Sequence, residues 1–162
     1  MPGKTDISKL NCSLARALSA VGDWWTLLIV RDAFLGATRF GQFQASLGIA
    51  RNILSARLAA LVEDGIMARD ASRARPEYRL TRKGREMLPA LIALLQWGDK
   101  WQSGGRAPVL CTDTHGRTLA PVRLTNRSGA AIDADTIRFR AGPGATRATR
   151  AYLDAVRPQK HD

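Results

Sequence analysis

The chain of 162 residues is long enough for one cored domain, or for a domain with an appendage. Its 45% hydrophobic and 24% charged residues exclude an intrinsically disordered chain. The longest apolar run, Trp24–Val30, is interrupted by a threonine and is far shorter than the roughly 18 residues of a membrane helix. Residues 1–10 are polar and lack the apolar core of a signal peptide, which predicts a cytoplasmic protein without a membrane partner.

The net charge of +11 is unevenly distributed. Residues 39–85 hold ten basic residues against four acidic ones, a surplus of six positive charges. Such a surplus favours a polyanionic partner, although a solvated arginine-rich surface would give the same charge.

The spacing of apolar residues predicts four helices in the first half of the chain. Asp23 is the expected N-cap of the second helix, which is apolar around most of its circumference and should lie in the core. The four predicted helices are Ser13–Val21, Trp24–Leu35, Phe40–Leu47 and Ala50–Asp64. In the second of them the residues expected to pack in the core are Trp25, Leu28, Ile29 and Phe34.

The fourth helix separates its side chains into two faces. One face is apolar, formed by Leu54, Leu58, Leu61 and Val62. The opposite face is polar or small, and near the start of the helix Arg51, Asn52 and Ser55 are free to reach outward.

Two extended runs and a further long helix follow. Ile66–Ser72 and Glu77–Leu80 predict strands of a hairpin whose turn, Arg73–Pro76, is basic. Thr81 is the expected N-cap of a helix that continues to about Ser103. Helices, a glycine-containing turn, a helix, a basic hairpin and a long helix are the order of a winged helix-turn-helix, a mainly helical α+β fold.

The glycines at 104 and 105 predict a boundary between a domain of residues 1–105 and an extension of residues 106–162. The extension contains three β-like runs and a weak helical tail. The runs are Val109–Thr112, Leu119–Leu124 and Thr136–Phe139, and the tail is Ala148–Val156.

The fold order predicts how such a chain binds double-stranded DNA. A major groove admits one α-helix, whose N-terminal half reaches the base edges. Arg51 and Asn52 are residue types that pair with guanine and adenine, and Ser55 suits a base or a phosphate. Phosphate contacts are expected from Arg39 and Arg57, and phosphate or minor-groove contacts from Arg73 and Arg75 at the wing tip.

Several motifs between residues 12 and 101 occur in the order and at the spacing of one known family. The motifs are Cys12-x-x-x-Arg16-x-Leu18, Gly22-x-x-Trp25-Thr26-Leu27-Leu28-Ile29-x-Arg31-Asp32, Arg39-Phe40-Gly41-x-Phe43, Gly48-Ile49, Leu54-Ser55-x-Arg57-Leu58-x-x-Leu61-x-x-x-Gly65, Tyr78-x-Leu80-Thr81-x-x-Gly84-x-x-Leu88 and Trp97-Gly98-x-x-Trp101. In these motifs the chain resembles the HxlR-type regulators, which are related in fold to MarR-type proteins.

The resemblance implies a homodimeric bacterial repressor or activator without a cofactor. It implies a dimer interface built from the N-terminal helix region and from the long helix after the wing. Two-fold symmetry then predicts a pseudo-palindromic operator with half-sites about one helical turn apart.

Three features depart from the family pattern. Ala50 replaces the usual serine at the start of the 50–64 helix, which forfeits a cap worth about 1 kcal/mol. The wing looks shorter than usual. In the extension, His115-Gly116 and Ser128-Gly129 stand where some relatives carry Cys-Gly knuckles, so that only Cys111 and His115 remain as plausible ligands. Because a zinc site needs about four Cys or His ligands, we expect a degenerate zinc-ribbon-like segment without metal.

Cys12 and four tryptophans suggest alternative functions, namely the sensing of oxidants and the binding of a small-molecule effector. In several relatives a cysteine at the position of Cys12 senses oxidants or electrophiles, whereas a free cysteine is more often a small buried apolar residue. The tryptophans could line an effector pocket at the dimer interface, but core and interface packing explains them more simply. They are Trp24, Trp25, Trp97 and Trp101.

Two other classes of function are weighed against DNA binding. An enzyme is disfavoured because the sequence holds no Ser/His/Asp set, no phosphate-binding glycine loop and no clustered carboxylates. An RNA-binding or protein-docking winged helix is the remote alternative, since RNA binders usually expose aromatic residues for base stacking.

Overall fold

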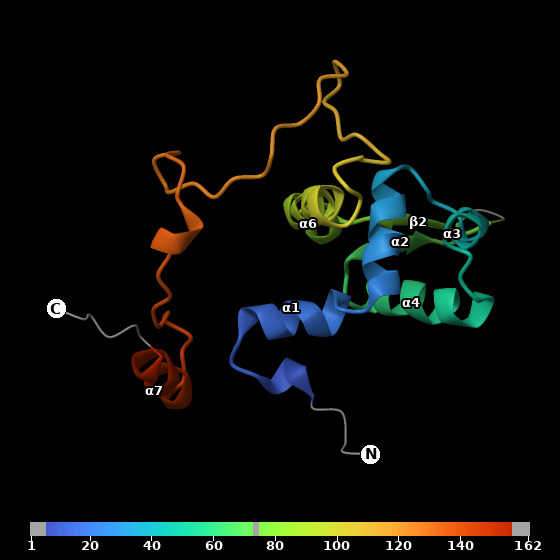
Figure 1. The fold of residues 1–162 in the computed structure, drawn as a ribbon. Coiled ribbons are helices and arrows are strands. Elements are labelled where there is room, and N and C mark those ends of the chain that lie inside the picture. Colours follow the sequence, from blue (N-terminus) through green and yellow to red (C-terminus); the bar gives the residue numbers. More distant parts are fainter. Residues whose placement is uncertain (1–5, 73–74, 157–162) are drawn as a thin grey trace. The chain divides into compact units, whose positions relative to one another are not determined.

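The computed structural model describes residues 6–72 and 75–156 (Figure 1). Its contacts divide the chain into two compact units, one of residues 17–122 and one that joins the residues up to 16 with those from 123 onward. Each unit is described by itself below. Within the described ranges, no helix combines the length and the apolar character needed to cross a membrane.

The four predicted N-terminal helices are confirmed to within one residue at each end. They are α1 (Ser13–Val21), α2 (Trp24–Phe34), α3 (Phe40–Leu47) and α4 (Arg51–Glu63). Asp23 caps α2 as predicted, since its Oδ1 accepts a hydrogen bond from the backbone N–H of Trp25 at 3.0 Å. Gly48 ends α3 with φ +60°, a left-handed conformation that turns the chain into α4.

The wing is a two-stranded antiparallel hairpin formed by β1 (Met67–Asp70) and β2 (Glu77–Leu80), with Met67 opposite Leu80. The first strand is shorter than predicted because the Asp70 carboxylate accepts hydrogen bonds from the N–H and hydroxyl of Ser72 and turns the chain. On its other side β2 pairs briefly with the segment before α3, where the Tyr78 N–H donates to the Thr38 carbonyl at 2.7 Å. The wing is thereby joined directly to the start of α3.

The single long helix predicted after Thr81 is wrong. The chain forms two helices, α5 (Arg82–Arg85) and α6 (Leu88–Trp101), with Thr81 capping α5 as predicted. Pro89 explains the break, because its nitrogen cannot donate to the Arg85 carbonyl and its ring would clash with that carbonyl in a continuous helix.

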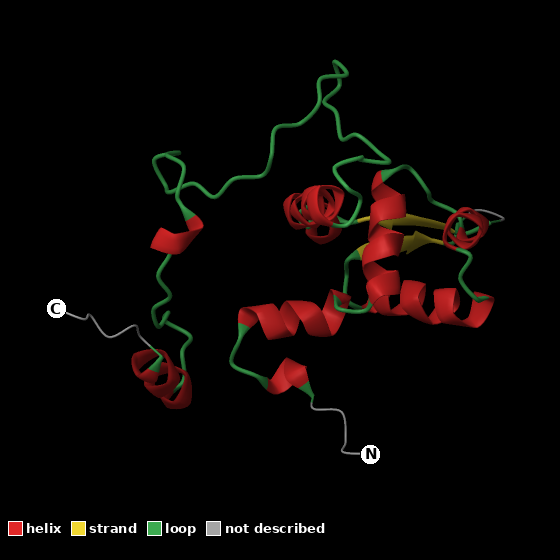
Figure 2. Cartoon of the chain, in the orientation of Figure 1, coloured by secondary structure: helices red, strands yellow, loops and turns green. Residues whose placement is uncertain are grey.

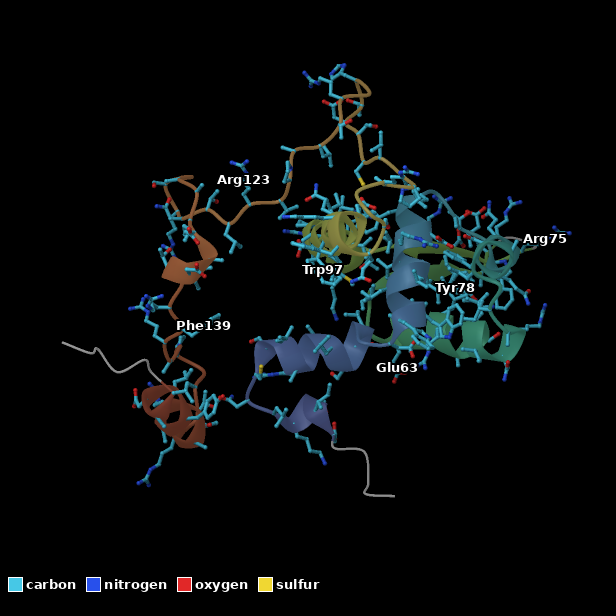
Figure 3. The ribbon with its side chains drawn as sticks, viewed as in Figure 1. Glu63, Arg75, Tyr78, Trp97, Arg123 and Phe139 are labelled. Carbon is cyan, nitrogen blue, oxygen red and sulfur yellow. The ribbon has the colours of Figure 1, made fainter. Side chains whose placement is uncertain are left out.

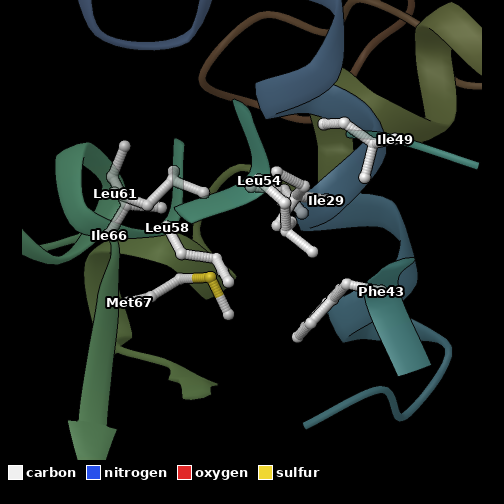
Figure 4. Packing of buried hydrophobic residues seen from close by; sticks show 9 residues of the cluster. Ile29, Phe43, Ile49, Leu54, Leu58, Leu61, Ile66 and Met67 are labelled. Atoms are coloured by element: carbon white, nitrogen blue, oxygen red, sulfur yellow. The ribbon is translucent and has the colours of Figure 1, made fainter. Parts of the chain in front are cut away.

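The core of the larger unit is formed where α2, α3, α4 and the wing meet, and Figure 4 shows it from close by. Trp25 and Phe34 pack against this core as predicted, but Leu28 is not part of the cluster and lines a groove, as Phe34 also does. Trp24 is 72% exposed. The buried cluster consists of Ile29, Val30, Phe43, Ile49, Leu54, Leu58, Leu61, Ile66 and Met67.

Beyond α6 most of the described chain is loop (Figure 2). The three predicted extended runs form no regular strand in the described residues; pairing is limited to two isolated bridges, Thr112 with Thr118 and Thr125 with Ala131. Each bridge closes a tight turn around a polar side chain. Asp113 accepts hydrogen bonds from its own turn, and the Arg117 guanidinium is the largest cause that lowers the pKa of its carboxyl.

The second turn has the same construction, and two helical segments follow it. Asn126 Oδ1 accepts from the N–H groups of Ser128 and Ala130, as Asp113 does in the first turn. A short 3₁₀ turn, η2 (Ala134–Thr136), follows, and α7 (Arg147–Ala155) confirms the predicted helical tail.

Asn11 ties the beginning of the chain to the beginning of α7. Its Nδ2 donates to the Gly144 carbonyl at 3.1 Å. Its Oδ1 accepts from the Thr146 N–H at 3.0 Å and from the Thr149 hydroxyl at 2.7 Å. One side chain thus holds the start of α7 within the smaller unit.

Replacing Gly84 by alanine should destabilise the fold strongly. A methyl group there would overlap the backbone carbonyl oxygen of Ile66, which cannot withdraw without disrupting the hairpin. We expect a loss of about 2–3 kcal/mol in the free energy of unfolding, measured by urea denaturation. The control is Gly41→Ala in α3, where a methyl group meets open space, so its midpoint should stay the same or rise slightly. Equal midpoints for Gly84→Ala and the wild type would contradict this packing.

Candidate DNA-binding interface

The first turns of α4 present a polar surface to solvent. Arg51, Asn52 and Ser55 are exposed, whereas Leu54 and Leu58 of the same helix are fully buried. Three of the predicted contact residues therefore share one accessible face. Further along this helix the exposed residues are small at Ala56, Ala59 and Ala60 and acidic at Glu63, so a close approach of the helix backbone to a surface is possible only before its last turn.

The N-terminus of α4 lacks a side-chain cap. Ala50 occupies the N-cap position and makes no capping hydrogen bond, as its side chain predicts. The N–H groups of the first turn, which have no partner within a helix, therefore add partial positive charge beside Arg51 and Asn52. A free helix N-terminus of this kind suits a phosphate oxygen.

Arg51 is held against α3. Its guanidinium lies 5.1 Å from the centre of the Phe40 ring, within cation–π range. This contact joins the first residues of the two helices and restricts the Arg51 side chain before any partner is bound.

Arg57, predicted as a phosphate contact, is held against α2. Its Nη2 lies 2.9 Å from Asp23 Oδ2, and both side chains are partly exposed. Asp23 therefore caps α2 with one carboxylate oxygen and binds α4 with the other. A phosphate that contacts Arg57 must share the guanidinium with this carboxylate.

A buried carboxylate joins the start of α3 to the wing. The Glu77 side chain is 6% exposed and lies 2.6 Å from Arg79 Nη2 and 3.6 Å from Arg39 Nη2. Arg39 and Arg79 are themselves more than half exposed, so the pairs leave part of each guanidinium accessible. The sequence analysis missed Arg79; the signal was its position two residues after Glu77 in a strand, which places both side chains on the same side.

The wing tip is described only in part. Arg75 is exposed, and Figure 3 shows its side chain at the outer end of the hairpin. Arg73 lies outside the described residues.

The basic residues directly after the wing form hydrogen bonds and an ion pair with neighbouring parts of the chain. Lys83 Nζ donates to the Asp64 carbonyl and Arg85 to the Leu80 carbonyl, each at 2.6 Å. Arg82 pairs with Glu86 at 3.0 Å. Within residues 39–85, the basic side chains considered for a partner are therefore those before α3, on α4 and on the wing.

Cys12 is exposed one residue before α1, which gives an oxidant access to its sulfur. Cys111 is half-buried. Across residues 6–72 and 75–156, no group of three or more His, Cys, Asp or Glu side chains is placed to hold a metal ion.

Three of the four tryptophans do not pack into the core of this chain. Trp25 lies against the core, and Trp24 meets it edge-on at 6.2 Å between ring centres. Trp97, labelled in Figure 3, and Trp101 both lie on α6, and each residue is more than half exposed.

Comparisons with known proteins agree on one family. The family model described as HxlR-like helix-turn-helix matches residues 20–105, from the end of α1 to the end of α6. The chain is 41% identical over 137 residues to Rv3095 of Mycobacterium tuberculosis, an HTH-type transcriptional regulator, covering 82% of this chain and 87% of that protein. It is 35% identical over 94 residues to another such regulator, sll1512 of Synechocystis, covering 56% of this chain and 70% of that one.

Solved structures show the same fold. The transcription factor structure of PA1607 is 40% identical with a TM-score of 0.74 and covers 85% of this chain and 100% of its own. That of PA1374 from Pseudomonas aeruginosa is 35% identical with a TM-score of 0.61, covering 87% and 99%. A MarR-family regulator of Enterococcus faecalis is 28% identical with a TM-score of 0.50.

The fold, the exposed polar residues of α4 and the similar proteins together identify the class of protein. The hairpin is the wing, and α3 and α4 are the helix-turn-helix of a transcriptional regulator rather than of an enzyme. The chain belongs to the HxlR-like helix-turn-helix family.

Proposed function

We propose that the chain regulates transcription as a homodimer that binds a pseudo-palindromic operator in double-stranded DNA with α4 in the major groove. The observation that supports this most strongly is the exposed group of Arg51, Asn52 and Ser55 at the start of α4. These residue types read base edges, and they stand on the half of the helix that enters the groove deepest.

Base reading is assigned to these three residues. The Arg51 guanidinium pairs with guanine, the Asn52 amide with adenine, and Ser55 with a base or a phosphate. The Phe40 ring under Arg51 restricts its rotamers, which lowers the entropy lost on binding.

Phosphate binding is assigned to the arginines around α4. Arg57 of α4 is held by Asp23, and Arg39 and Arg79 before α3 and on the wing are held by Glu77. Arg75 at the wing tip adds to these contacts, and the predicted contact of Arg73 is kept as part of the proposal. Each phosphate neutralised releases counterions, so the affinity should fall steeply with salt.

Homodimerisation is supported by apolar residues that this chain leaves uncovered. Leu14 and Leu18 on α1 are exposed, as are Leu94, Trp97 and Trp101 on α6. Exposed apolar groups on this scale mark interaction surfaces, and the two helices are those that the family resemblance assigns to the dimer. A two-fold dimer presents two copies of α4 to two half-sites.

Redox control through Cys12 is a second candidate, favoured by one observation. The sulfur is exposed at the start of α1, one of the two helices proposed for the dimer, so its oxidation would change that surface.

Removing the side chains of Arg51 and Asn52 should weaken the discrimination between DNA sequences. The double substitution Arg51→Ala with Asn52→Ala should weaken operator binding at least about 30-fold, because each bidentate pair contributes about 1–3 kcal/mol. Fluorescence anisotropy with an operator found by binding-site selection measures this, and Arg150→Ala on α7 serves as the control. The assignment fails if the double variant binds the operator as tightly as the wild type.

Arg79→Ala should remove a phosphate contact without changing the sequence preference. The slope of log affinity against log salt should become shallower by about 0.9, the value for one phosphate. Operator titrations at several salt concentrations measure this slope, with Arg150→Ala again as the control. An unchanged slope would exclude Arg79 from the interface.

Trp97→Glu should convert the dimer to monomers at micromolar concentration, because it places a charge in the middle of the proposed apolar interface. Sedimentation velocity measures the mass. Tyr152→Glu on α7, which adds the same charge to another exposed aromatic position, should leave the dimer intact. A dimeric Trp97→Glu protein would place the interface elsewhere.

A further inference from the structure

A groove between α2 and α6 is used neither by the proposed DNA surface nor by the exposed tryptophans of α6. It has a volume of about 730 Å³ and lies within the unit of residues 17–122. This volume is in the range of small-molecule sites, which are mostly apolar with a few polar groups. The residues that give it its apolar lining include Trp24, Leu28, Phe34, Leu91, Leu95 and Val109.

The segment after α6 forms one wall of the groove through Pro108, Val109 and Cys111, and it is tied down. Gln96 of α6 donates from Nε2 to the Ala120 carbonyl at 3.1 Å and accepts at Oε1 from the Val122 N–H at 2.7 Å. The Leu119 N–H in turn donates to the Cys111 carbonyl at 2.8 Å. The wall is therefore preformed in the single chain.

A buried carboxylate lies in the lining of the groove. The Asp32 side chain is 3% exposed, and its Oδ1 accepts from Arg31 Nε at 2.9 Å and from Nη2 at 2.7 Å. Its Oδ2 is buried and has no hydrogen-bond partner within the described part of the chain. A buried carboxylate oxygen without a hydrogen-bond donor costs free energy. A hydrogen-bond donor supplied by a ligand would therefore be bound favourably.

The charges of the lining decide what kind of donor fits. Asp32 and Asp99 contribute two carboxylates, and Arg31 contributes one guanidinium, which leaves one negative charge in excess. Trp24 presents an aromatic surface to the same space, and such surfaces attract cations.

We propose that this groove is an effector site for a lipophilic cation: an apolar or aromatic body with a protonated amine, whose N–H donates to the Asp32 carboxylate and displaces part of its contact with Arg31. The proposed dimer surface shares Leu94 with the lining of the groove, whereas Trp97 and Trp101 are not among the lining residues.

The groove has a physical connection to the DNA-binding helix. Its wall α2 carries Asp23 at its first turn, and Asp23 holds Arg57 of α4. A ligand that shifts α2 therefore acts on the position of α4. This consequence rests on the proposed function; binding of the cation does not.

Three naphthalene compounds with a cationic, a neutral and an anionic polar group test the site without DNA. They are 1-naphthylmethylamine, 1-naphthalenemethanol and 1-naphthoate, titrated by isothermal calorimetry. The amine should bind about tenfold more tightly than the alcohol, the effect of one charge-assisted hydrogen bond, and the carboxylate most weakly. Asp32→Asn should bind the amine and the alcohol with equal affinity, while Asp135→Asn, at an exposed position outside the groove, should keep the preference.

A second variant keeps the test decisive if Asp32→Asn fails to fold. Leu91→Trp fills the groove and should abolish binding of all three compounds. Equal affinities of the wild type for amine and alcohol, no saturable binding, or unchanged amine binding by Leu91→Trp would overturn the proposal. DNA binding is not part of these measurements, so their failure would leave the proposed function untouched.

Discussion

The packing of one side of α4 against the core is the constraint on which the rest of the molecule depends. Leu54, Leu58 and Leu61 are buried among α2, α3 and the wing, and this fixes the rotation of α4 about its own axis. Arg51, Asn52 and Ser55 at the start of the same helix stay exposed, so the packing of the leucines also sets the direction in which these three side chains leave the helix. A helix free to rotate could not present the same three side chains to a groove each time.

Around this helix the basic side chains are anchored rather than free. Asp23 holds Arg57, Glu77 holds Arg39 and Arg79, and the Phe40 ring lies under Arg51. Pairs at a partly exposed surface contribute little to stability, typically below about 1 kcal/mol. Their value is positional: a guanidinium already restricted to one region loses less entropy when it binds. The same pairs join α2, α3, α4 and the wing, so that a change in one element reaches the others.

The local features of the fold could be predicted from the sequence because their causes are local. Apolar spacing and the cap at Asp23 were sufficient to place the helices up to residue 63 and the hairpin after them. The long helix after Thr81 was predicted wrongly because its apolar stripe outweighed Pro89, whose missing N–H separates α5 from α6. Leu28 was misplaced since a helix that is apolar all round does not reveal which side meets the core.

Features that depend on distant parts of the chain could not be predicted in this way. The grouping of Glu77 with Arg39 and Arg79 requires the pairing of β2 with the segment before α3, which no local pattern encodes. The groove lining requires α2, α6 and residues 108–111 to come together, and the ties from Gln96 are equally non-local. In the extension, β-like composition produced only single bridges, because no partner strand lies beside it in the described residues.

Methylation interference on the selected operator tests the central claim most directly, because dimethyl sulfate marks the guanine N7 in the major groove and the adenine N3 in the minor groove. The account predicts that methylated guanines block binding in two patches about one helical turn apart on one face of the duplex. Blocking confined to a single patch, or to adenine N3 alone, would contradict a dimer that reads DNA with α4 in the major groove.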